Sequence, residues 1–130
     1  MARTYSDIQA DGFIDGWDVG RLWELTRQMP RKRVPLEEIT DFDLVTWFNP
    51  NCSPTSRAVA EHAKRIQEVI FDYPIILSAK GEVMDGMHRV AKAWVLGMKN
   101  IEAVQFDKDP EPDERIMPEN LPGLPWKGPA

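Results

Sequence analysis

Residues typical of helix interiors recur at helical spacing in three stretches of the chain. The first follows Asp18, a residue type that caps helices, and stops at Pro30; its periodic positions are Val19, Leu22, Trp23, Thr26 and Met29. The second starts at Ser53-Pro54 or Thr55, with an apolar stripe at Val59, Ala63, Ile66 and Ile70. The third opens after Asp85-Gly86 and stops at Gly97, with a buried side at Val90, Ala93, Trp94 and Leu96. We expect three amphipathic helices.

Short β-prone runs lie between and after these helices. Residues 33–39 alternate apolar and polar, and Pro35 favours a sheet edge because proline lacks the N–H that a central strand donates. Residues 74–78 and 83–84 are typical of two strands joined by the turn 79–82, and residues 101–106 alternate as a last strand. This order predicts an α/β (α+β) fold, a small mixed sheet flanked by helices.

The chain is long enough for one domain with one modest core, since it has 130 residues of which 42% are hydrophobic. Residues 1–32 are expected to form an N-terminal arm and helix, with the first dozen residues loosely held. Residues 33–107 form the core. Residues 108–130 form a proline-rich tail without regular helix or central strand. The tail contains the apolar residues Leu121, Leu124 and Trp126. They favour docking of the tail onto the domain over contact with a protein partner.

The charge balance bears on possible partners. Acidic residues outnumber Lys and Arg by 21 to 16, a net charge of -5, which disfavours broad DNA binding because DNA-binding surfaces are usually basic. The basic run 31–33 is typical of a solvated loop. A single cysteine, Cys52, and the lack of a leader pattern favour the cytoplasm, and no apolar run approaches the roughly 20 residues that a membrane helix needs.

The informative chemistry lies where the strand 83–84 meets the third helix. A helix N-terminus presents unpaired N–H groups and a partial positive charge, both of which attract phosphate. Gly86 allows close backbone approach, Arg89 offers a forked cationic contact, and His88 offers a donor or a proton-transfer group. Asp85 could cap the helix or hold a metal that accompanies a nucleotide. An ordinary Asp-Gly turn with Asp85 as the cap predicts the same residues.

Residues 73–106 also resemble the core of the ParB N-terminal/sulfiredoxin superfamily. The matching order is a Pro-Ile strand, a glycine turn, a short strand, the turn Asp85-Gly86-Met87-His88-Arg89 and an alanine-containing helix. Residues 34–39 and the helix after Pro54 fall where that family places its first strand and helix. Small single-domain ParB-like bacterial proteins are the most similar members.

The resemblance implies a nucleotide at this turn: ATP, ADP or CTP, with Mg²⁺. Gly86, Met87, His88 and Arg89 would bind its phosphates, and Asp85 and His88 are the catalytic candidates. Arg57 lies where partition proteins place a further phosphate-binding arginine, although an ordinary helix start also explains it. No residue is assigned to a metal site of the protein itself.

Differences from the family's motifs reduce the number of family activities that the chain is expected to have. Sulfiredoxins carry their catalytic cysteine where this chain has Met87, and a thioether cannot act as that nucleophile. Partition proteins carry Gly-Glu-Arg-Arg here and add DNA-reading and dimerisation segments that the proline-rich remainder cannot supply. Free-serine kinases have an Asp-Gly-His-His-Arg turn, which differs at one position. Their catalytic carboxylate follows the first strand, where this chain offers Glu38, Asp41 or Asp43.

Two functions of different kinds remain. One is a nucleotide- or phosphate-binding domain, an ATP- or ADP-dependent phosphotransferase or a nucleotide hydrolase. The other is a non-catalytic interaction module with a protein partner or a second copy of the chain; a DNA-binding, partition-related role is disfavoured by the acidic balance. His62 has no second metal ligand nearby and is assigned no role. Core packing is expected to explain the tryptophans and Phe48, including Trp17, Trp23, Trp47, Trp94 and Trp126.

Overall fold

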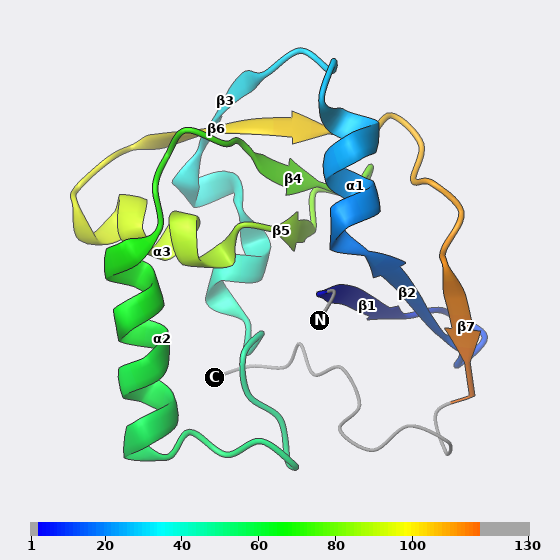
Figure 1. Cartoon of the computed structure of the whole chain (residues 1–130), viewed down its shortest axis with the longest axis horizontal. Coiled ribbons are helices and arrows are strands. Elements are labelled where there is room, and N and C mark those ends of the chain that lie inside the picture. The colour runs from blue at the N-terminus through cyan, green and yellow to red at the C-terminus, as the bar shows by residue number, and fades with distance from the viewer. Residues whose placement is uncertain (1–2, 118–130) are drawn as a thin grey trace.

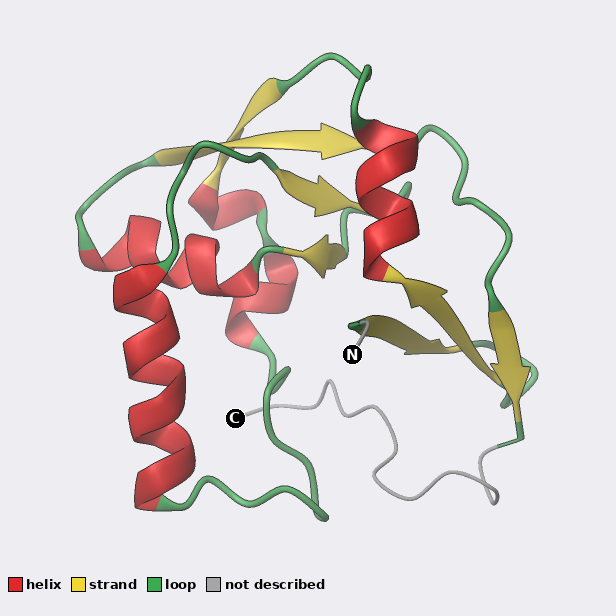
Figure 2. Ribbon diagram, viewed as in Figure 1, coloured by secondary structure: helices red, strands yellow, loops and turns green. Residues whose placement is uncertain are grey.

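The computed structural model describes residues 3–117 and shows a mixed α+β fold with two small sheets (Figures 1 and 2). The larger sheet has the strand order β3-β6-β4-β5, and only β4 and β6 run parallel. Its strands are β3 (Lys32–Pro35), β4 (Ile75–Leu77), β5 (Val83–Asp85) and β6 (Asn100–Gln105). The α+β class and the edge position of the strand with Pro35 are thus as predicted.

Three α-helices and two 3₁₀ turns accompany this sheet. The helices are α1 (Val19–Thr26), α2 (Ser56–Glu68) and α3 (Met87–Val95), and the 3₁₀ turns η1 (Leu36–Glu38) and η2 (Thr40–Asp43) follow β3. The predicted helix starts are confirmed for α1 and α2, because Asp18 accepts a hydrogen bond from the Arg21 N–H and Thr55 accepts one from Ala58.

The core lies on both faces of the larger sheet. Successive strand residues point to opposite faces, so Ile75 and Leu77 join the cluster under Val90 and Ala93 of α3, while Ile76 packs with Leu22 of α1 on the other face. Two helices therefore sandwich the sheet. The end of β5 is held between them, and this position builds the candidate site.

Most of the segment expected to be a loose arm forms a strand and a turn over the described residues 3–12. β1 (Thr4–Ile8) pairs antiparallel with β2 (Ile14–Asp18), from Thr4 opposite Asp18 to Ile8 opposite Ile14. The strand carries many polar residues because it is at the edge of the smaller sheet, and this composition concealed it.

Part of the proline-rich tail is also a strand. β7 (Glu114–Ile116), in a stretch without proline, pairs with β2 to give the sheet order β1-β2-β7. The Trp17 indole N–H donates to the Pro110 carbonyl at 2.8 Å, so the chain before β7 is held as well. The two ends of the described chain thus form one sheet. The predicted docking of Leu121, Leu124 and Trp126 lies outside the described residues.

Two predicted buried stripes are only partly confirmed. No residue of α2 is buried, and Val59 and Ile70 are half exposed, because α2 packs on α3, Trp47 and Phe48 with the side that carries His62 and Ile66. On α3 the core takes Val90, Ala91 and Ala93, which leaves Trp94 exposed at 64% and Leu96 at 60%.

Core packing explains only one tryptophan of the described residues. Trp17 is buried between the sheets, whereas Trp23 and Trp94 are exposed and Trp47 is half buried. Phe48 is half buried as well and contacts His62 edge to face.

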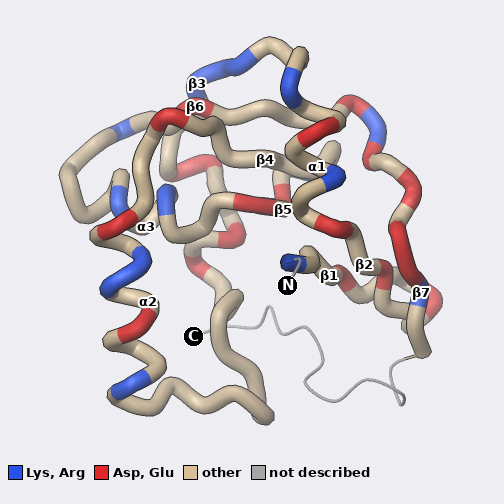
Figure 3. The backbone as a smooth tube through the Cα atoms, viewed as in Figure 1, with Lys and Arg blue, Asp and Glu red and all other residues tan. Residues whose placement is uncertain are grey.

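Figure 3 shows basic and acidic residues interspersed along α2, and Arg31 of the basic run 31–33 is paired with Glu102. The run is exposed, as predicted, but the predicted loop is wrong, because Lys32 and Arg33 belong to β3 and pair with β6.

Candidate functional site

The turn between β5 and α3 requires glycine for a structural reason. Gly86 is the N-cap residue of α3 and has φ 112° and ψ 19°, in the left-handed region that other residues adopt at a cost. A Cβ atom on Gly86 would lie 2.6 Å from Cγ2 of Ile75. Gly86 thus lets α3 start directly against the buried strand β4.

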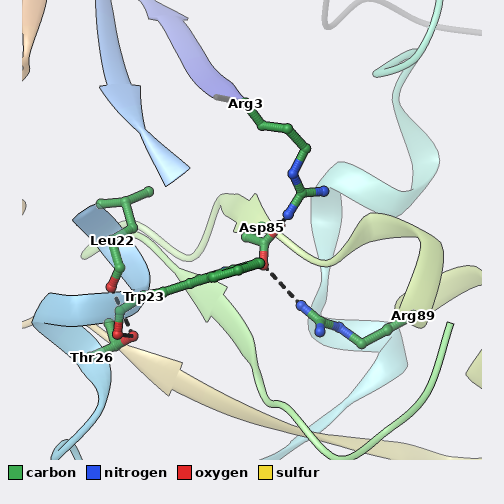
Figure 4. A network of polar contacts seen from close by, with 6 residues as sticks. All are labelled: Arg3, Leu22, Trp23, Thr26, Asp85 and Arg89. Atoms are coloured by element: carbon green, nitrogen blue, oxygen red, sulfur yellow. Dashed lines mark hydrogen bonds and ion pairs between the residues drawn. The ribbon is translucent and has the colours of Figure 1, made fainter. Parts of the chain in front are cut away.

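Asp85 holds together three side chains from distant parts of the chain (Figure 4). Its Oδ1 accepts from Arg3 at 2.6 Å, and its Oδ2 accepts from the Trp23 indole at 2.8 Å and from Arg89 at 2.9 Å. The carboxylate is buried, and no side chain caps α3. Both oxygens of Asp85 are thus engaged, so the predicted cap is wrong.

The predicted phosphate contact Arg89 faces Asp85 in this structure. It forms an ion pair with Asp85 one helical turn away, its side chain is 12% exposed, and its buried Nε has no hydrogen-bond partner among the described residues. Arg57 is exposed in the first turn of α2. The hydrogen bonds between α2 and α3 involve residues from His62 onward, so the structure does not bring Arg57 to the turn.

A pair of histidines lies beside the turn, on the side facing α2. His88 Nε2 and His62 Nδ1 are 2.8 Å apart and share a hydrogen bond. The indole of Trp47 stacks on both imidazoles, with ring centroids 4.4 Å from His88 and 4.5 Å from His62. Trp47 therefore packs on the histidine pair and holds the two rings side by side.

Both imidazoles are kept neutral at pH 7. The pKa of His88 is lowered to about 4, chiefly by burial and also by the neighbouring His62, Arg65 and Arg3, against Asp85, which raises it. Burial and Arg65 also lower the pKa of His62, against Glu61. A neutral imidazole carries one N–H donor and one acceptor nitrogen, as a general base requires.

A cleft of about 540 Å³ opens between the smaller sheet and the start of α3. It brings together four of the predicted site residues, Asp85, Gly86, Met87 and His88. Among the candidate carboxylates it includes Asp41, which is buried and accepts a hydrogen bond from the Val83 N–H, whereas Glu38 and Asp43 line other depressions. The volume suits a small organic ligand.

Comparisons with known proteins do not extend this description. No protein-family model, curated protein or solved structure matches the chain. Over residues 3–117, no helix has the length and apolar character needed to cross a membrane. The same residues contain no group of three or more His, Cys, Asp or Glu side chains placed to hold a metal ion.

Four residues of this region carried no predicted site role: Arg3, Trp23, Trp47 and His62. Arg3 and Trp23 reach Asp85 across 82 and 62 residues of sequence, and no local pattern connects positions that far apart. For His62 the position on the flank of the apolar stripe of α2, three residues after Val59 and four before Ile66, was a usable signal, because it places the side chain toward α3 once the packed side of α2 is known.

Proposed function

We propose that this chain is a ParB/sulfiredoxin-type domain that binds the phosphates of a nucleotide, ATP, ADP or CTP with Mg²⁺, in the cleft at Gly86. The observation that carries the proposal is the start of α3, which lines the cleft without a side-chain cap. The N–H groups of a first helical turn lack partners within the helix and attract anions.

Arg3 is the cation of the cleft best placed to meet a phosphate. It lines the cleft, its side chain is 59% exposed, and Asp85 holds it beside the start of α3. In this role it replaces Arg89, whose guanidinium supports Asp85 from the other side. Exposure leaves Arg3 donors for a ligand while the Asp85 contact fixes its position.

The remaining walls suit the other parts of a nucleotide. Tyr5 and Trp47 border the cleft and offer aromatic surface for a base. Carboxylate oxygens are the ligands that Mg²⁺ prefers, and Asp41 and Glu114 border the same cleft. Asp41 is buried and already accepts from the Val83 N–H, so Glu114, which is exposed, is the carboxylate that would contact a magnesium ion accompanying the phosphates, and the ion would supply positive charge to the phosphoryl oxygens.

The test is a thermal-shift panel of the chain with ATP, ADP, CTP and GTP, each with and without Mg²⁺. A ligand at a hundred times its Kd stabilises by about 2.7 kcal/mol, a shift of several degrees for a domain of this size. We expect a nucleotide-selective shift that Arg3→Gln abolishes. Arg27→Gln is the matched control, because Arg27 is exposed, pairs with Glu24 one helical turn away and lies outside the cleft lining.

A flat panel would overturn the proposal. Arg89→Ala is the less informative variant, since it would leave the buried Asp85 with one cationic partner fewer and so lower stability as well as affinity.

The exposed end of α3 favours a second candidate, a protein-interaction module. Trp94, Val95 and Leu96 are consecutive and each is at least 60% exposed. Apolar surface of this kind marks contact sites more often than single exposed residues do. A flat nucleotide panel together with partner capture or self-association that Trp94→Glu abolishes would favour this function.

A further inference from the structure

The histidine pair connects the cleft with helix α2. His88 borders the cleft, while its hydrogen-bonded neighbour His62 belongs to α2 and lies outside the cleft lining. Among the described residues, none makes a hydrogen bond to His88 Nδ1 or to His62 Nε2. Each ring thus keeps one nitrogen available. These are Nδ1 of His88, which borders the cleft, and Nε2 of His62, which lies outside the cleft lining.

Filling space between the helices does not account for both the burial of the two histidines and the parallel orientation of their rings. Histidines placed only to fill space between helices lose solvation, and here burial lowers both pKa values. Trp47 nevertheless holds the rings almost parallel, with 10° between their planes, in the arrangement that lets their nitrogens share one proton. The charged groups near the pair are Arg65, which acts on both imidazoles, Glu61 at His62, and Arg3 and Asp85 at His88.

We propose that His88 and His62 form a proton relay for hydrolysis of the bound nucleotide, with water as the nucleophile. The inference rests on the proposed nucleotide site. His88 is the catalytic base, and His62 is a positioning residue that carries the proton onward. Trp47 fixes the geometry of both rings.

The relay balances in atoms and charge. As the water oxygen bonds to the terminal phosphorus, its proton passes to His88 Nδ1 and the phosphoanhydride bond breaks, with its electrons on the departing nucleotide oxygen. The proton on His88 Nε2 moves to His62 Nδ1, and the proton on His62 Nε2 leaves to solvent. Each ring ends as its other neutral tautomer, which exchange with water resets.

The test measures phosphate release by the full chain with the nucleotide that gives the largest thermal shift, with Mg²⁺. We expect His62→Gln to lower kcat at least tenfold with KM and the thermal shift unchanged, because glutamine can bond to His88 but cannot relay a proton. His62→Gly should regain activity when imidazole is added. Lys64→Gln, an exposed change on the same helix, should leave kcat unchanged.

The outcomes separate the relay from the binding site. A nucleotide-selective thermal shift without phosphate release in the unaltered chain would overturn the relay and leave the proposed binding site standing. Release at the same kcat and the same pH profile in His62→Gln would also overturn the relay. A flat thermal-shift panel would overturn both proposals.

Discussion

At the scale of single residues, the turn before α3 contains residues that suit a binding site and are also needed for contacts within the fold. The Asp-Gly-Met-His-Arg pattern located the turn correctly, and four of its five residues line the cleft. The sequence could not predict that Gly86 is also required by the Cγ2 methyl group of Ile75, or that Asp85 faces three N–H donors. Both facts depend on contacts made only after folding.

Substitution of Gly86 is therefore expected to affect folding. Gly86→Ala would place a Cβ atom 2.6 Å from Ile75 and force a left-handed conformation, and these effects together should lower the free energy of unfolding by about 2–4 kcal/mol. Urea denaturation measures the change.

Gly81→Ala is the control, because Gly81 also has a positive φ, 89°, but has nothing within 4 Å of the added atom. We expect its cost to be only about 1 kcal/mol. Equal losses for the two variants would show that the contact with Ile75 does not constrain this turn.

At the scale of elements, the sequence predicted which segments are helical better than it predicted which sides they bury. Caps and proline stops are local, so the helices were found with starts close to Asp18, Thr55 and Gly86. The buried side depends on neighbours. α2 packs against α3 and Trp47 with the side that carries His62, so part of its apolar stripe is left half exposed.

The α2–α3 contact should make stability depend on pH. The pKa of His88 is lowered from 6.5 to about 4, and that of His62 is lowered as well, so the unfolded chain binds more protons than the folded one between these values. The free energy of unfolding should thus be fully retained above about pH 6.5 and should fall as the pH drops toward 4.

Urea titrations between pH 4.5 and pH 7 check this slope. His88→Gln should flatten it, and Lys64→Gln should not. Asp11 and Asp113 also have lowered pKa values, but these carboxylates lose their contribution only below their ordinary value of 3.8, outside this window. A slope that persists in His88→Gln would contradict the assignment of the pH dependence to this imidazole.

At the scale of the whole molecule, the main surprise is the smaller sheet. It joins the segment expected to be a loose arm to the start of the segment expected to be a structureless tail. Pairing between residues about 100 positions apart, such as Ile14 and Ile116, leaves no periodic signal in either segment. This sheet completes the cleft, because Tyr5 and Glu114 lie in it and Arg3 directly precedes β1.

The central claim, that the cleft at the start of α3 binds phosphate, is tested most directly by following backbone amide signals in an NMR titration with inorganic pyrophosphate and then with nucleotide. We expect saturable shifts that are largest at the N–H groups of Met87 and His88 and that disappear in Arg3→Gln. Shifts confined to the basic run 31–33, or none at all, would contradict phosphate binding at this site.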